Sequence, residues 1–306
     1  MFFVNDAIGF LGGNGIYKTT DGGATWKVSY RVPYDNVLYI TDFYFWDGDH
    51  GYASYQWSEG SDYEGGFLST VDGGDTWKMV VPYWQPVFSV FFTSSTTGFA
   101  TILDWIDGPA ELPSQILLKT YDGGRTWKRL FSTLCEQGSL TVRSADSKTG
   151  YAHNRNAVFR TIDGGESWKS VVENDYIMSA SVLPENIINA NITSGGLLET
   201  SPSTMLRSTD GDNWNPTINF PHTILAQGFS PSGNIGFAIG ISGTNPSSPN
   251  PRSQTLSLNE SVDKGATWTE VEVTESLYGY PLAVALPSDK VAYVLFDREI
   301  IKFTRP

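Results

Sequence analysis

The sequence predicts an all-β protein built as a β-propeller of seven blades, the last of them incomplete. Three observations support this fold class. An eight-residue motif with an Asp-Gly-Gly core and a closing Trp recurs along the 306 residues. A Gly followed by Phe or Tyr recurs in register with it. The aspartates of successive motifs lie 51, 50, 41, 47 and 53 residues apart, and a period of roughly 40–50 residues is typical of four-stranded propeller blades.

Each copy of the first motif is interpreted as a tight turn between two strands. The Asp accepts hydrogen bonds from backbone N–H groups a few residues on, the Gly pair supplies positive φ, and the Trp covers the turn. Four copies are complete, at 19–26, 70–77, 120–127 and 161–168; the copy at 208–214 is one residue short, and the copy at 261–268 carries Lys264 for the first Gly. The residues assigned to this structural role are Asp21, Trp26, Asp72, Trp77, Asp122, Trp127, Asp163, Trp168, Asp210, Trp214, Asp263 and Trp268.

These turns resemble the Asp-box, or BNR, repeat of bacterial sialidases, sortilin-like receptors and photosystem II assembly-factor propellers. The chain is most similar to the seven-bladed assembly-factor type and more distantly similar to sialidases. The resemblance implies that each box joins the third and fourth strands of a blade, on the outer rim. It does not fix a function, because one fold carries many activities.

The strands can be placed in order from these markers. Four-stranded units are expected over 2–30, 37–81, 87–131, 140–172, 177–218 and 224–273, and a Gly-aromatic pair marks the second strand in five of the six. A seventh unit, 281–285, 291–296 and 299–304, has no box and no fourth strand. We therefore expect one domain over residues 1–306, of about seven repeats of 41–53 residues. We also expect residues preceding Phe2 in the native chain to supply the missing strand, because propellers avoid open edges.

Composition narrows the class of partner. The formal net charge of −13 argues against nucleic acid and against an anionic membrane surface. Cys135 is the single cysteine, so no internal disulfide forms, and no apolar run is long enough to span a membrane. The N-terminus does not have the pattern of a signal peptide. The resemblance nevertheless implies an exported protein, periplasmic, cell-surface or secreted, whose signal has been removed.

The candidate ligand site lies on the loops opposite the boxes. Aromatic rings beside carboxylates there suit stacking on a glycan or contact with a protein or peptide. The residues predicted to bind are Arg31, Trp57, Tyr63, Trp84, Trp105, Asp104 and Asp107, with the indoles facing solvent. No cofactor or metal is expected, since the boxes share one carboxylate each whereas Ca²⁺ takes six to eight oxygens.

Two functions remain open from the sequence. We interpret the chain as a non-enzymatic binding or assembly module. The alternative is a carbohydrate-active enzyme. It could be a glycoside hydrolase that pairs Asp104 with Asp107, or either of these with Glu173, or a polysaccharide lyase that uses His153 or His222. The sialidase pattern fits poorly, because Arg31-Val32-Pro33 follows the first box and no motif supports the further arginines that such a site needs, for which Arg143, Arg155 and Arg207 are available.

Overall fold

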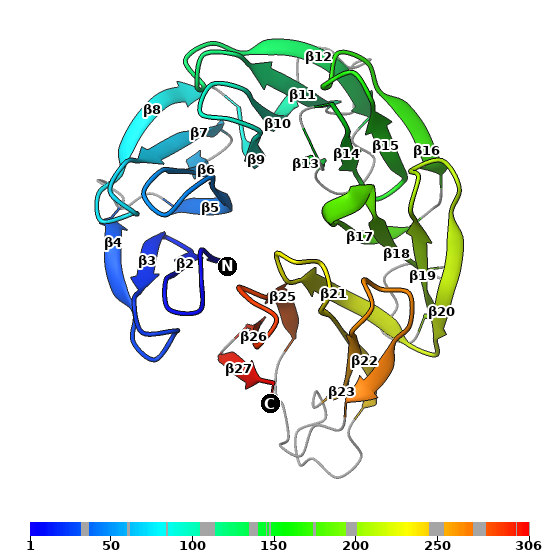
Figure 1. The fold of residues 1–306 in the computed structure, drawn as a ribbon. Coiled ribbons are helices and arrows are strands. Elements are labelled where there is room, and N and C mark those ends of the chain that lie inside the picture. The colour runs from blue at the N-terminus through cyan, green and yellow to red at the C-terminus, as the bar shows by residue number, and fades with distance from the viewer. Residues whose placement is uncertain are drawn as a thin grey trace. The chain divides into compact units, whose positions relative to one another are not determined.

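The computed structural model describes residues 1–31, 37–59, 62–83, 85–104, 114–134, 140–144, 146, 148–173, 176–193, 201–244, 254–271, 280–297 and 299–305. Six antiparallel sheets of four strands and one of three form the seven blades that the repeats predict, and each sheet follows the chain from its first strand to its last (Figure 1). The only helix in the described residues is one 3-10 turn, Pro184–Asn186. None of the described segments is a helix with the length and apolar character needed to cross a membrane.

The chain divides into two compact units, and each is described by itself. The first comprises Met1–Asn154 and Thr161–Lys169, and the second Arg155–Arg160 and Ser170–Pro306. The expectation of a single domain over 1–306 stays a prediction.

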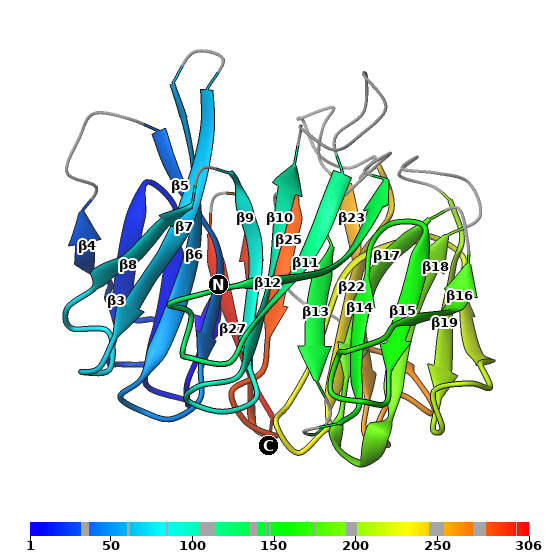
Figure 2. The same cartoon turned by 90° about the horizontal axis from the view of Figure 1, so that it is seen from above.

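The first unit holds the first three blades. They are β1 (Phe2–Phe3), β2 (Gly9–Gly12), β3 (Gly15–Thr19) and β4 (Lys27–Arg31); β5 (Val37–Phe45), β6 (Gly51–Glu59), β7 (Asp62–Thr70) and β8 (Lys78–Tyr83); and β9 (Val87–Phe92), β10 (Gly98–Asp104), β11 (Ser114–Thr120) and β12 (Lys128–Leu134). The fourth sheet comprises β13 (Thr141–Ser144), β14 (Gly150–His153), β15 (Ala157–Thr161) and β16 (Lys169–Glu173). Figure 2 shows the long strands β5, β6 and β7 running side by side, as their register requires.

The second unit holds the last three blades. They are β17 (Ile177–Val182), β18 (Ile188–Thr193), β19 (Ser203–Ser208) and β20 (Asn215–Phe220); β21 (Thr223–Phe229), β22 (Gly236–Thr244), β23 (Gln254–Ser261) and β24 (Thr269–Val271); and β25 (Pro281–Ala285), β26 (Val291–Phe296) and β27 (Ile300–Thr304). The last blade has three strands in the described residues, as predicted.

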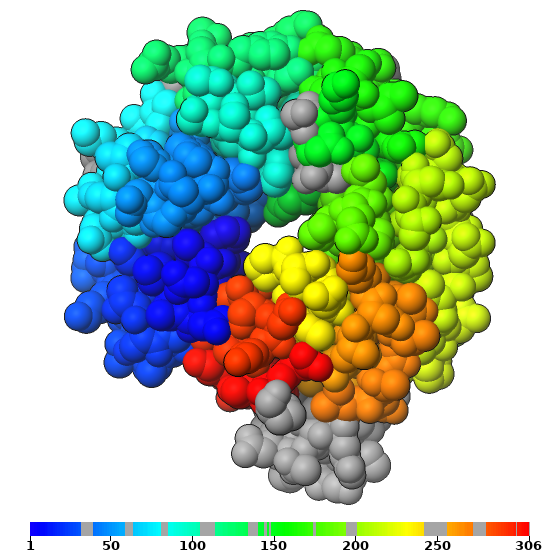
Figure 3. All heavy atoms as spheres, viewed as in Figure 1, coloured from blue at the N-terminus to red at the C-terminus, as the bar shows by residue number. Residues whose placement is uncertain are grey.

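The core of the first unit lies between neighbouring blades. Phe10 and Ile16 of the first blade pack with Phe43, Phe45 and Trp77 of the second in one buried cluster. The space-filling view shows these blades, in dark and lighter blue, packed directly against each other (Figure 3). Each blade therefore buries its apolar face against the next, as repeat proteins do.

The boxes close through hydrogen bonds within eight residues. In the second box, Asp72 Oδ1 accepts from the Thr76 backbone N–H at 2.9 Å and from the Thr70 hydroxyl at 2.8 Å, while Thr76 Oγ1 donates to Oδ2 at 2.5 Å. Gly73 and Gly74 have φ of 67° and 80°, where glycine carries no steric penalty. The hydrogen bonds from Thr76, and then Thr70, lower the pKa of Asp72 to about 2.

The two altered boxes lose part of this network. In three complete boxes the indole N–H donates to the carbonyl of the second Gly: Trp26 to Gly23, Trp127 to Gly124 and Trp168 to Gly165, at 3.0–3.1 Å. Trp214 Nε1 and Trp268 Nε1 have no acceptor among the described residues. Lys264, at the first Gly position of the last box, has φ of 61°.

Candidate functional site

The structure describes part of the predicted loop site. Arg31 is exposed at the end of β4, and Trp57 on β6 is half-buried against the cluster between the first two blades. The expectation that the Trp57 ring faces solvent therefore holds for only part of the ring. The Tyr63 side chain, Trp84, Trp105 and Asp107 lie outside the described residues. A shared binding role for this set stays a prediction.

Asp104 is the predicted acid whose surroundings the structure describes most fully. It ends β10 and is buried, with Oδ1 accepting from Gln85 Nε2 at 2.8 Å and Oδ2 lying 3.6 Å from Arg129 Nη1. The Asp104 carboxylate thus contacts the Gln85 amide and the Arg129 guanidinium. Its partner in the hydrolase alternative, Asp107, is not described, and Glu173 belongs to the other unit. The carboxylate pair stays a prediction.

A further polar cluster lies elsewhere, on the first strands of three successive blades. Asp42 of β5, Ser89 of β9 and Arg143 of β13 meet there. Arg143 Nη1 lies 3.3 Å from both Asp42 Oδ2 and Ser89 Oγ, and Nη2 lies 3.4 Å from Asp42 Oδ1. Ser89 Oγ also donates to Asp42 Oδ2 at 3.0 Å. We call these three residues the inner-strand cluster.

Strand register shows which position of the repeat Arg143 occupies. Arg143 pairs with Tyr151 across β13 and β14, in the position where Tyr44 pairs with Tyr52 and Phe91 with Phe99 in the two preceding blades. An arginine thus replaces the aromatic residue of the repeat. The rings of Tyr44 and Phe91 are 4.6 Å apart and adjoin the cluster, where burial raises the pKa of Tyr44 and the Arg143 charge opposes that shift.

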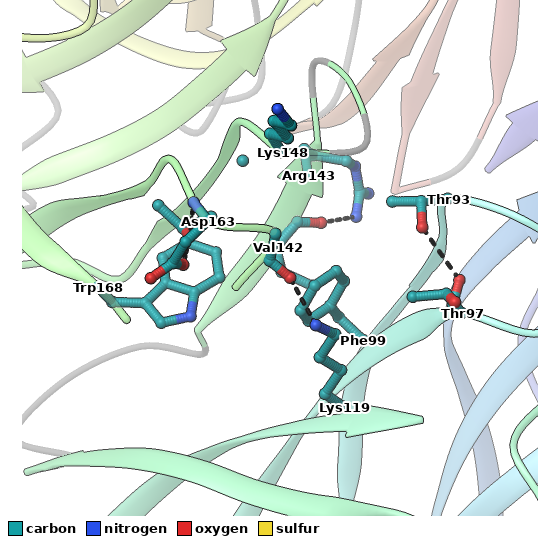
Figure 4. A pocket seen from close by; sticks show the side chains of 12 residues that line it. Thr93, Thr97, Phe99, Lys119, Val142, Arg143, Lys148, Asp163 and Trp168 are labelled. Atoms are coloured by element: carbon teal, nitrogen blue, oxygen red, sulfur yellow. Dashed lines mark hydrogen bonds between the residues drawn. The ribbon is translucent and has the colours of Figure 1, made fainter. Parts of the chain in front are cut away.

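The Arg143 guanidinium can still bind an anionic ligand. Its side chain is 37% exposed, whereas that of Asp42 is 18% exposed. Its best hydrogen bond, 2.8 Å, goes to its own strand at Val142 O, and Figure 4 shows this contact. Arginine has five N–H donors in a planar fork that fits a carboxylate. The long contacts to Asp42 leave room for a ligand anion to share or displace that partner.

Burial, and then the nearby Arg143 charge, lower the pKa of His153 to about 4. The imidazole is therefore neutral at neutral pH, and Arg143 is the local cation. No group of three or more His, Cys, Asp or Glu residues suited to a metal ion occurs in the described part of the chain.

The sequence points to one member of the inner-strand cluster and misses two. Arg143 lies on the first strand of its blade, and the sequence offers it only as a candidate for a sialidase arginine. Asp42 carries a usable signal, because it is the one charged residue in the run Val-Leu-Tyr-Ile-Thr-Asp-Phe-Tyr-Phe. Ser89 carries no such signal, and its role follows from the contact alone.

Comparisons with known proteins agree on the fold. The family model described as photosynthesis system II assembly factor YCF48 matches residues 29–214. A solved structure of YCF48 from Cyanidioschyzon merolae is 17% identical with a TM-score of 0.63, and the alignment covers 99% of this chain and 94% of that one. A structure described as YCF48 bound to D1 peptide is 19% identical with a TM-score of 0.50, covering 90% and 96%.

A GH74 xyloglucanase from Xanthomonas campestris has a TM-score of 0.66 at 12% identity, covering 99% of this chain and 51% of the enzyme. At these identities the structural matches show a shared fold. No curated protein matches the sequence.

Proposed function

The chain belongs to the photosynthesis system II assembly factor YCF48 family, and from this premise we propose that it is a non-enzymatic module that binds a segment of a partner protein. The inner-strand cluster is the observation that carries the proposal. It offers a partly exposed guanidinium near the ring pair Tyr44–Phe91, and so suits a peptide carboxylate with an apolar neighbour.

The peptide class is supported by the family. A protein described as YCF48 has been solved with a D1 peptide, and we carry that kind of ligand over to this chain. The predicted loop residues, Arg31, Trp57, Tyr63, Trp84, Trp105, Asp104 and Asp107, are a second candidate contact surface in this proposal. A glycan is the alternative ligand, and we retain it as one arm of the test. Action outside the cytoplasm is likewise part of the proposal and rests on the Asp-box resemblance.

The test is binding of a fluorescently labelled D1 peptide by the wild type, Arg143→Gln and Lys27→Gln. A charge-assisted hydrogen bond contributes roughly 1.5–3 kcal/mol, so Arg143→Gln should weaken binding by about tenfold or more. Lys27 is exposed on β4, and its substitution removes the same charge away from the cluster. Binding should therefore survive in Lys27→Gln.

Melting curves of each variant check that the fold persists. Equal affinity of the wild type and Arg143→Gln would remove the cluster from the site. Absence of peptide binding by the wild type, together with a glycan-array signal and release of reducing sugar, would favour the carbohydrate-active alternative.

A further inference from the structure

A phenylalanine closes the end of the first strand in four blades. It pairs across the strands with the Gly of the Gly-aromatic motif: Phe3 with Gly9, Phe45 with Gly51, Phe92 with Gly98 and Phe229 with Gly236. The ring lies directly on the glycine. A Cβ built on Gly9 or Gly98 would lie 2.5 Å from a ring carbon, and one built on Gly51 would lie 2.6 Å away. The glycine is required because the ring takes the space of a side chain.

The same phenyl ring meets the box Trp of its own blade edge-to-face. The ring centroids of Phe45 and Trp77 lie 5.9 Å apart at 87°, and those of Phe92 and Trp127 lie 6.3 Å apart at 72°. The pairs Phe3–Trp26 and Phe229–Trp268 repeat this geometry. Each of these blades is thus closed by a ring held between a glycine and an indole.

The fourth blade keeps the glycine and the indole but has no phenylalanine at the end of its first strand. Ser144 occupies the register position opposite Gly150. The atom nearest to a Cβ built on Gly150 is Thr161 Cγ2 at 3.2 Å, followed by Arg143 O at 3.4 Å and a Trp168 ring carbon at 3.6 Å. Trp168 still donates to Gly165 O at 3.0 Å. Among the described residues, no ring therefore takes the place that a phenylalanine fills in the other four blades.

A pocket occupies this place, and we call it the blade-four pocket (Figure 4). Its volume is about 180 Å³, and Gly150, Val142, Thr161 and Trp168 line it together with Phe99 of the third blade. An engineered apolar cavity of about 150 Å³ in another protein binds benzene. The pocket thus has the size for one aromatic ring, and Phe99, Val142 and Trp168 give it one apolar side within an otherwise polar lining.

The rim has an excess of positive charge. Lys119, Arg143 and Lys148 line the same pocket together with one acid, Asp163, whose carboxylate accepts hydrogen bonds from the Thr161 and Ser167 hydroxyls. Lys119 Nζ is already held by Gly164 O and Glu166 Oε1, both at 2.7 Å. Lys148 is exposed, and the described residues give its Nζ no ion-pair partner. A ring bearing a carboxylate therefore finds both an apolar seat and a cation at its edge.

We propose that the blade-four pocket binds a phenyl-sized ring that carries a carboxylate, in the place that a phenylalanine of the chain fills in four other blades. The ring packs edge-to-face on Trp168, and Lys148 binds the carboxylate. This chemistry belongs both to the C-terminal phenylalanine of a peptide and to a free arylacetate. The peptide source rests on the proposed function, whereas binding of the free acid does not.

The test uses phenylacetate, N-acetylphenylalanine and N-acetylphenylalaninamide in calorimetric titrations and protein-observed NMR. We expect both acids to bind and to shift the Trp168 indole N–H signal, and the amide to bind about tenfold more weakly, since it lacks the charge that Lys148 binds. Lys148→Gln should make the affinities of N-acetylphenylalanine and its amide equal. Binding of N-acetylphenylalanine with the same affinity as phenylacetate, or more tightly, would point to the peptide source. Tighter binding of phenylacetate would point to the free acid.

The decisive variant is Ser144→Phe, which restores the residue of the repeat. It should abolish binding of all three probes, whereas Ser144→Ala should leave it unchanged. Should Ser144→Phe not fold, Gly150→Val fills the pocket from the second strand and takes its place. Unchanged binding in a folded, filled variant, or no binding by the wild type, would overturn the proposal.

Two outcomes separate the pocket from the proposed function. Equal binding of the D1 peptide by the wild type and Ser144→Phe, with loss of phenylacetate binding, would keep the pocket but refute its use by that peptide. Phenylacetate binding without any peptide binding would keep the pocket and refute the proposed function.

Discussion

Lys119 Nζ lies 2.7 Å from Glu166 Oε1, although the lysine belongs to the third strand of one blade and the glutamate to the box of the next. The pair follows the repeat, with the cation three residues before its own box Asp and the acid three residues after the next one. Lys18 and Asp75 repeat this spacing between the first two blades at 2.6 Å. Such a pair ties a third strand to the neighbouring box.

Glu166→Gln should lower the free energy of unfolding by about 1–2 kcal/mol. The Lys119 side chain is 6% exposed, and loss of its counter-charge leaves a buried cation; the figure is discounted because the Glu166 side chain is 44% exposed. Asp75→Asn is the matched control, and we expect less than about 1 kcal/mol because Asp75 is mostly exposed. Urea denaturation measures both. Equal losses would contradict the role of burial.

Trp77→Ala should cost roughly 3–5 kcal/mol, the range for removing a large aromatic side chain from a core. Trp77 is buried against Phe10, Phe43 and Phe45, and its Nε1 donates to Ser29 Oγ of the preceding blade at 2.9 Å. Trp77→Phe, which keeps a ring, should cost less. Thermal and urea unfolding of the two variants would show this order, and the reverse order would refute the packing role of the indole.

Lys264→Gly should raise the free energy of unfolding by about 0.5–1 kcal/mol. A left-handed conformation costs a non-glycine residue roughly 1–2 kcal/mol, which exceeds the entropy that glycine adds to the unfolded chain. The change also removes an ion pair with Glu185 at 2.8 Å, and Glu185→Gln measures that part separately. The reverse substitution at the equivalent position, Gly123→Lys, should destabilise. A Lys264→Gly protein less stable than Glu185→Gln would argue against the strain.

Stability should fall as pH falls from about 6.5 towards 4. The unfolded chain protonates an imidazole near pH 6.5, whereas the pKa of folded His153 is about 4, so the unfolded state binds more protons in this window. Burial also lowers the pKa of His222, which acts in the same direction. The His153 contribution is about 1–3 kcal/mol, fully present above pH 6.5. His153→Phe should flatten the dependence between pH 7.5 and 4.5 in urea titrations, and parallel curves would contradict this assignment.

The carboxylates of the boxes affect stability in a lower range of pH. The pKa of Asp21, Asp72 and Asp122 is about 2, so their hydrogen bonds persist through pH 4 and their contribution is lost below it. One series of unfolding measurements over pH therefore separates the contribution of His153, lost between pH 6.5 and 4, from that of the box aspartates, lost below pH 4.

Local chemistry made much of the fold predictable. The hydrogen bonds within a box join residues at most four positions apart, as between Asp72 and Thr76. An eight-residue motif is therefore enough to place a turn and the two strands beside it. The Gly-aromatic pair placed five of the second strands in the same way. The seventh blade was predictable without a box because 281–285 and 291–296 are apolar runs bounded by turns, and the structure has strands over those same residues.

The sites depended on register between distant strands, which the repeats alone did not supply. Ser144 can be recognised as the replacement for the closing phenylalanine only from the strand pairing. It pairs with Gly150 in the same way as Phe92 pairs with Gly98. The sequence by itself determined the blades and their turns, because those rest on hydrogen bonds between near neighbours. Only the tertiary structure decided that Asp42, Ser89 and Arg143 meet, because their contacts join residues 47 to 101 positions apart and depend on how each blade packs against the next.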